Sequence, residues 1–282
     1  MSAHRLPGKS SRFLVKGSRL SVLGSRLVTL TLVLAPAITL AQVPAGTPVA
    51  VSPAMRMLDS ARAVLARSTP IGDIPGMKHA QALLSRAETA QPNDAWLLHY
   101  LGYALYKEAT SSYGMGRDNY LPILERADSV LELSAKHAAI PETHALRSSV
   151  LGMMIGSNPI KGMTLGPKSN DQMERALELG PNNPRVWMIR GIGAFNTPGI
   201  FGGGMDKAET YLKKAIELFA SDKPVSPAPS WGANEAHAWL GQVYARDDRK
   251  ELARAEYLKA LAIEPNDQWV RMGLLPGLDK KN

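Results

Sequence analysis

The sequence contains no cysteine, and this absence excludes several kinds of protein at once. Without thiols the chain has no disulfide framework, no thiolate zinc or iron–sulfur centre, no cysteine nucleophile and no lipid-anchored N-terminal cysteine. Aromatic residues are also few, at 6% of 282 residues, while 45% are hydrophobic and 21% are charged. A chain of this composition is too apolar to be disordered and too polar to cross a membrane many times. The fold must therefore be held together by packing.

Acidic residues are absent from the first 41 residues, and this explains most of the net charge of +8. That segment holds six of the 33 basic residues, so the rest of the chain has 27 basic and 25 acidic residues. A nearly neutral surface gains little affinity from releasing the counterions of a phosphate backbone. Nucleic acid is therefore not expected as a partner.

The N-terminus has the three parts of a secretory signal peptide. A basic region precedes the uncharged run LVTLTLVLAPAITLA at residues 27–41, and the small residues Thr39 and Ala41 precede Gln42. We expect a signal peptide over residues 1–41, cleaved near Ala41 and Gln42, and a flexible proline-rich tether over 42–53. The exported chain would then be periplasmic or secreted. The alternatives are an uncleaved anchor or a later translation start, but the run is shorter than the roughly 20 apolar residues that span a bilayer.

Three segments share the spacing apolar-x2-Ala-x4-Pro. They are Leu84, Ala87 and Pro92; Met173, Ala176 and Pro181; and Tyr257, Ala260 and Pro265. Four apolar helical patterns also contain a glycine, at Gly102, Gly152, Gly191 and Gly241. Small residues allow two helices to cross closely, and the proline ends the second helix. The spacing therefore predicts repeated antiparallel helical hairpins.

The last repeat resembles the tetratricopeptide repeat. The residues that carry this resemblance are Leu240, Gly241, Tyr244, Ala253, Tyr257, Ala260 and Pro265, with His237 in place of the leading tryptophan. Residues 196–218 are also similar to a segment of exported bacterial tetratricopeptide repeat proteins to which no reaction is assigned. The resemblance implies an all-α solenoid in which stacking buries the apolar face of each hairpin.

We expect about five such hairpins with extended turns, followed by a C-terminal capping segment. Their residues are 54–90, 94–134, 142–180, 184–220 and 233–263, with the cap near 266–274. The repeat domain would thus cover residues 54–274, and residues 275–282 would form a tail.

Several hairpins carry extra residues between their helices, and these insertions are rich in glycine and contain methionine. Insertions at equivalent points of a solenoid project from one edge. We therefore expect a row of loops along one edge of the molecule. Its apolar residues are Met115, Met163, Phe201 and Met205.

The segment that begins near residue 95 is unusually rich in aromatic residues. Gly102 and its leucine neighbours share one face, whereas Trp96, His99 and Tyr103 fall on the opposite side. In tetratricopeptide repeats that opposite side lines a concave groove, so the resemblance places a partner there. The alternative is that these aromatic residues pack against neighbouring hairpins. The predicted groove residues are Trp96, His99, Tyr103, Tyr106, Met153, Arg185, Met188, Ile192 and Phe195.

Specific catalytic and metal-binding motifs are missing. The stretch GMTLGPKS at residues 162–169 has three residues instead of four between its glycines, and His137, Glu142 and His144 lack the spacing of a zinc-binding helix. We expect no metal, no cofactor and no enzymatic activity. The expected function is that of an exported scaffold that binds a peptide or protein in its groove. The alternative is a soluble binding protein for a small apolar ligand in envelope transport.

Overall fold

A computed structural model describes residues 52–280, which form helices and no strand. The predicted signal peptide and most of the tether lie outside these residues. The α-helices are α1 (Pro53–Ser68), α2 (Ile74–Ala90), α3 (Ala95–Gly114), α4 (Tyr120–His137), α5 (Pro141–Ser157), α6 (Gly162–Leu179), α7 (Pro184–Asn196), α8 (Met205–Phe219), α9 (Ala233–Arg246), α10 (Lys250–Ile263) and α11 (Leu275–Gly277). Three tighter or wider helical turns are η1 (Pro159–Lys161), η2 (Gly199–Phe201) and η3 (Trp269–Leu274).

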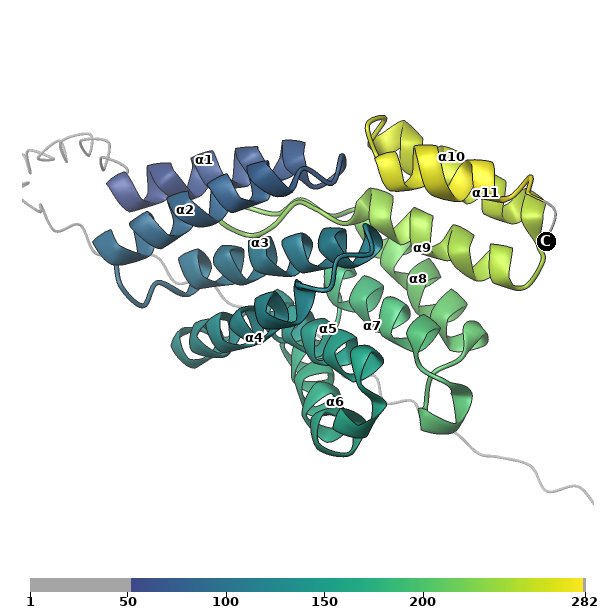
Figure 1. The fold of residues 1–282 in the computed structure, drawn as a ribbon, viewed down its shortest axis with the longest axis horizontal. Coiled ribbons are helices and arrows are strands. Elements are labelled where there is room, and N and C mark those ends of the chain that lie inside the picture. Colours follow the sequence, from purple (N-terminus) through teal and green to yellow (C-terminus); the bar gives the residue numbers. More distant parts are fainter. Residues whose placement is uncertain (1–51, 281–282) are drawn as a thin grey trace, which may run out of the picture. The chain divides into compact units, whose positions relative to one another are not determined.

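Consecutive helices pair into five hairpins, from α1 with α2 to α9 with α10 (Figure 1). The second helix of each hairpin packs on the first helix of the next, except that α5 packs more extensively on α7 than α6 does. At the C-terminus η3 packs on α10, and Val270 and Leu278 are buried. This arrangement confirms the expected all-α solenoid of five hairpins with a C-terminal cap. Because Leu278 is buried, packing continues past residue 274.

Side-chain caps fix the first turns of two helices that bear on function. Asp94 accepts hydrogen bonds from the backbone N–H groups of Trp96 and Leu97, at 2.9 and 3.1 Å. Asn183 accepts one from the backbone N–H of Arg185, at 3.0 Å. Such caps satisfy N–H groups that have no partner within the helix. They hold Trp96 and Arg185 at fixed positions in the first turns of α3 and α7.

A small residue lies at the helix crossing of every hairpin. It is the eighth or ninth residue of each first helix: Ala61, Gly102, Ser148, Gly191 and Gly241. A Cβ atom added to Gly191 would lie 2.6 Å from Leu212 Cγ, and one added to Gly241 would overlap the ring of Tyr257. In the third hairpin the Ser148 and Ser169 hydroxyl groups meet at 3.1 Å. The predicted glycines at 102, 191 and 241 are therefore close-contact positions.

The expected register of the third hairpin is wrong by about one helical turn. Gly152 is exposed, and an added Cβ would meet no atom within 4 Å. The close contact is made by Ser148 instead. The equivalent of Tyr103 and Ile192 in α5 is consequently Ser149, not Met153, since each of these is the ninth residue of its helix.

We expect Gly241→Leu to lower the free energy of unfolding by about 1 to 3 kcal/mol, because the new side chain overpacks the crossing with Tyr257. Gly152→Leu is the matched control. It should leave stability unchanged or raise it by up to about 1 kcal/mol, since leucine is a better helix former than glycine. Urea unfolding of both variants measures the difference. Equal losses at the two sites would contradict the assigned helix crossings.

The connections within hairpins are shorter than the sequence pattern suggested. Residues 162–169, which include the predicted loop-edge residue Met163, form the first turns of α6 with Pro167 inside the helix, and α3 continues to Gly114. Pro167 is the sixth residue of α6, so its missing N–H removes one backbone hydrogen bond of the helix. Within residues 52–280 no helix is long and apolar enough to span a lipid bilayer.

Candidate interaction site

The long connection between α8 and α9 returns to the N-terminal hairpins. In Figure 1 it runs beside α1 and α3, which belong to the first and second hairpins, although in the sequence it joins the fourth hairpin to the fifth. We call residues 222–231 the strap. Its contacts come from side chains on the first helices of three hairpins: Arg62 on α1, Tyr100 and Tyr103 on α3, and Arg185 on α7. These four residues are called the strap-binding surface below.

Each end of the strap is anchored by one strong contact. At the beginning, the Arg185 guanidinium donates to the Asp222 carboxylate at 2.6 Å, and only 2% of the arginine side chain is exposed. At the end, the Trp231 ring stacks on Tyr103 with centroids 4.8 Å apart and planes 8° from parallel. The Arg185 guanidinium also lies 5.8 Å from the centroid of Trp231. The two anchors therefore belong to one buried cluster.

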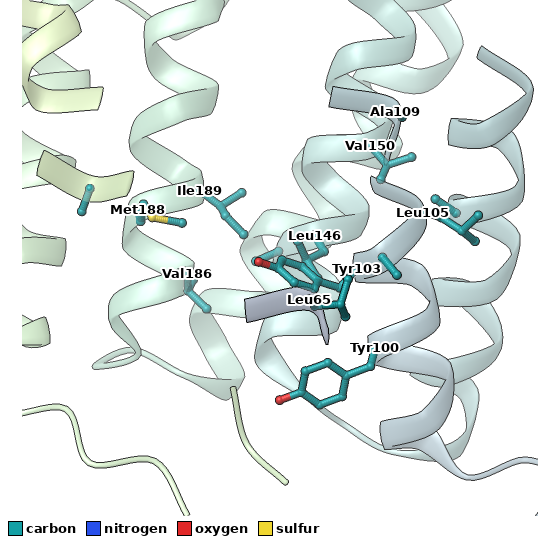
Figure 2. Close-up of a cluster of buried hydrophobic side chains, with 14 of the residues drawn as sticks. Leu65, Tyr100, Tyr103, Leu105, Ala109, Leu146, Val150, Val186, Met188 and Ile189 are labelled. Atoms are coloured by element: carbon teal, nitrogen blue, oxygen red, sulfur yellow. The ribbon is translucent and has the colours of Figure 1, made fainter. Parts of the chain in front are cut away.

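The middle of the strap is held through its backbone. The Tyr100 hydroxyl donates to the carbonyl oxygen of Pro227 at 2.9 Å. Arg62 donates to the carbonyl oxygen of Ala228 at 3.3 Å and to the Ser226 hydroxyl at 2.8 Å. Figure 2 shows Tyr100 and Tyr103 projecting from the same side of α3. The N–H of Ala228 donates to the carbonyl oxygen of Val225 at 2.9 Å, so the middle of the strap is a turn. This side of α3 thus binds a non-helical polypeptide segment that contains a turn.

An ion pair closes the site where α9 begins. The Lys107 ammonium on α3 lies 2.7 Å from the Glu235 carboxylate. Burial by itself would lower the pKa of Lys107, but the Glu235 carboxylate together with the phenol groups of Tyr103 and Tyr106 outweighs this effect and raises the pKa above its usual value. Lys107 therefore stays charged and ties α3 to α9.

Next to the strap lies a histidine that is completely buried. His99 Nδ1 is 2.9 Å from the Thr143 hydroxyl, and the ring packs edge-on against Trp96 and Tyr100. Burial, aided by the charge of Arg185, lowers the pKa of His99 from 6.5 to about 3. The imidazole is therefore neutral at physiological pH.

Three buried nitrogen atoms of this cluster have no hydrogen-bond partner among the described residues: His99 Nε2, Arg185 Nε and Trp231 Nε1. Each unpaired buried polar atom costs about 1 to 3 kcal/mol. Most buried polar groups in folded proteins are paired, so three in one cluster is unusual. The strap therefore leaves part of the hydrogen-bonding capacity of this site unused.

The buried histidine predicts an acid-sensitive fold. Since the pKa of His99 is lower in the folded state than in the unfolded chain, its contribution to stability is complete above about pH 6.5 and is lost as the pH falls toward 3. We expect a loss of about 2 kcal/mol near pH 5 that is absent from His99→Gln. Urea unfolding across this pH range measures the effect, with His79→Gln as an exposed control. An identical pH dependence in wild type and His99→Gln would contradict it.

The structure brings together some of the predicted groove residues and separates others. His99, Tyr103, Arg185 and Met188 are buried, and an added Cβ at Gly232, just after the strap, would lie 3.3 Å from Met188 Sδ. Trp96, Tyr106, Met153, Ile192 and Phe195 are partly buried. Tyr106 binds Ser149 on α5, and Phe195 packs edge-on against Trp239 on α9. Arg62, Asp222 and Trp231, which hold the strap, are not among the residues predicted from the sequence.

Three of the four predicted loop-edge residues are strongly exposed. Met115 is 52% exposed, Met163 is 86% exposed and Phe201 is 74% exposed, whereas Met205 is partly buried at the start of α8. Met115 also borders a shallow surface pocket between the connections of the first two hairpins. The other residues that line it are Gly72, Asp73, Ile74, Pro75, Lys78 and Arg117. Among the described residues no group of three or more acidic or histidine side chains is placed to hold a metal ion.

Comparisons with known proteins agree with this architecture. A family model of the tetratricopeptide repeat matches residues 235–267, the fifth hairpin and the turn after it. The structure of the HusA haemophore from Porphyromonas gingivalis is similar, with 26% identity, a TM-score of 0.57, and 68% of this chain and 93% of that chain covered. A thermophilic tetratricopeptide repeat protein, TTC0263 from Thermus thermophilus, gives 20% identity, a TM-score of 0.55, and 80% and 98% coverage. No curated protein matches the sequence. The chain thus has a helical solenoid fold similar to that of tetratricopeptide repeat proteins, and its fifth hairpin matches the family model of that repeat.

Proposed function

We propose that this protein is an exported, non-enzymatic interaction scaffold that binds a non-helical segment of a partner protein. The observation that carries the proposal is the strap, because the strap-binding surface already holds a non-helical polypeptide segment of the same chain. Tyr100 and Arg62 bind backbone carbonyl oxygens, which every polypeptide offers. Tyr103 and Arg185 add an aromatic and a cationic contact. Tetratricopeptide repeat solenoids are a common scaffold for such interactions.

Photo-crosslinking tests the binding of a partner. Benzoylphenylalanine placed at Tyr106, three residues after Tyr103 on α3, should crosslink to one contiguous segment of a partner in the native envelope. The same group placed at Leu252, which is 49% exposed on α10, is the control. Peptide mapping of the crosslinked products identifies the segment. Equal crosslinking at both positions, or no polypeptide at Tyr106, would refute the proposal.

The export part of the proposal rests on the basic and apolar pattern of residues 1–41. An intact mass that corresponds to a chain starting at or near Gln42 supports it. Recovery of the full-length chain in the membrane fraction contradicts cleavage, and recovery from the cytoplasm contradicts export. Either result leaves the binding proposal to be tested separately.

The likeness to the HusA haemophore supports a second candidate function, which is binding of a small, flat apolar ligand such as haem. The pocket beside Met115 has apolar walls, and Lys78 and Arg117 border it. These cations would suit the carboxylates of such a ligand. Titration with haemin, followed by visible absorbance, should show saturable binding that weakens about tenfold in Lys78→Glu. Lys213→Glu is the control, and unsaturable binding or equal affinity in both variants rejects this candidate.

A further inference from the structure

We propose that the strap is an intramolecular occupant of the partner site, and that a partner segment of the same chemistry displaces it. This inference rests on the proposed function and specifies the partner. The displacing segment is non-helical and contains proline and a central turn, as the strap does. It carries a carboxylate for Arg185 and an aromatic side chain for Tyr103 nine residues further along. Its backbone carbonyl groups take the positions of Pro227 and Ala228.

Most residues of the strap are more exposed to solvent than the residues of the strap-binding surface that hold it. Of residues 222–231, all described, only Pro229 is buried, and Val225 is 82% exposed. In the strap-binding surface, by contrast, Tyr103 is only 3% exposed and Arg185 is only 2% exposed. Segments with few buried contacts open at lower free energy than helices of the core. The strap can therefore leave the surface while the solenoid stays folded.

The contacts of the strap are of a kind that another chain can reproduce. Hydrogen bonds to backbone carbonyl oxygens depend on the path of the backbone and on no particular side chain. The strap contains Pro224, Pro227 and Pro229, which keep it from forming a helix, and its backbone turns at residues 225–228. Only the carboxylate at one end and the aromatic ring at the other carry specific chemistry.

The hydrogen bonding of the buried cluster is incomplete when the strap is bound. His99 Nε2 and Arg185 Nε have no partner among the described residues, and both side chains are almost entirely buried. Asp222 engages only one terminal nitrogen of Arg185. A carboxylate placed to accept from both Nε and a terminal nitrogen would pair the guanidinium more completely. The geometry therefore favours an external carboxylate over that of Asp222.

A fluorescein-labelled peptide with the sequence of residues 221–232 is the probe for this site. In the full chain, Asp222→Ala with Trp231→Ala removes both anchors of the strap and leaves the strap-binding surface intact. Because the strap no longer competes, this variant should bind the peptide at least about tenfold more tightly than wild type in fluorescence anisotropy. Replacing aspartate by asparagine in the peptide should weaken its binding about tenfold, and a scrambled peptide should not bind.

A second variant keeps the test decisive if the first one does not fold. Val225→Gly, Ser226→Gly and Ala228→Gly loosen the middle of the strap and retain Asp222 and Trp231. A folded variant of either kind that binds the peptide no better than wild type overturns this inference. Crosslinking of a partner segment at Tyr106 would then still support the proposed function. If the peptide binds but no partner is crosslinked, the chemistry assigned to the site is supported and the proposed function is rejected.

Discussion

Replacing Tyr103 with alanine is expected to lower the free energy of unfolding by about 3 to 5 kcal/mol, the cost of a large aromatic cavity. Tyr103 is 3% exposed and stacks on Trp231, so its truncation removes packing within α3 and against the strap together. Urea or thermal unfolding followed by circular dichroism measures the loss.

Tyr113 is the matched control, because it is on the same helix but is 61% exposed. Tyr113→Ala loses only an edge-on contact with Tyr120 and should cost less than about 1 kcal/mol. A Tyr103→Ala protein that is as stable as Tyr113→Ala would show that Tyr103 lies on an open surface, and the strap would not cover it.

Asp222→Ala is expected to destabilise the protein by about 3 kcal/mol, because it leaves the buried guanidinium of Arg185 without its carboxylate. The two atoms in contact are 2.6 Å apart, and Asp222 is 19% exposed while Arg185 is 2% exposed. Lys223→Ala, at an exposed neighbouring position of the strap, should change stability by less than about 0.5 kcal/mol.

A double-mutant cycle separates the ion pair from general damage to the strap. Arg185→Met combined with Asp222→Ala removes both charges and keeps an apolar side chain of similar length in the core. The double variant should be more stable than the sum of the single losses predicts, by about 1 to 3 kcal/mol. Strict additivity would mean that the two side chains do not interact.

Much of the fold follows from the sequence because repeated spacings report helix contacts directly. The alanines at 87, 176 and 260 are completely buried, and Gly102, Gly191 and Gly241 make close crossings as expected. The third hairpin shows the limit of this reasoning. Its crossing uses Ser148 and Ser169, so the glycine that fits the pattern, Gly152, is one turn away. A pattern of residue types does not distinguish between small residues that satisfy the same packing.

The candidate site was predicted less completely. Aromatic residues at a spacing of three or four positions put Trp96, His99 and Tyr103 on one side of α3, and the binding of a partner there stays a prediction. The long interval between Ala215 and Gly241, with its prolines and Trp231, is visible in the sequence as an extra connection. The path of this connection cannot be seen in the sequence, because contacts such as that of Arg62 with Ala228 join residues 166 positions apart. Such contacts depend on how the hairpins stack, which local spacing does not specify.

Tethering the strap provides the most direct test of the central claim, which is that the strap and a partner segment occupy the same surface. The chain has no cysteine, so Arg62→Cys with Ser226→Cys places a unique thiol pair where the two side chains now hydrogen bond at 2.8 Å. A short bis-maleimide then bridges the strap to α1, and the single-cysteine variants treated with the same reagent are controls. Binding of the labelled 221–232 peptide is measured by anisotropy before and after bridging. We expect bridging to weaken binding at least about tenfold, whereas equal affinity before and after bridging would contradict the claim.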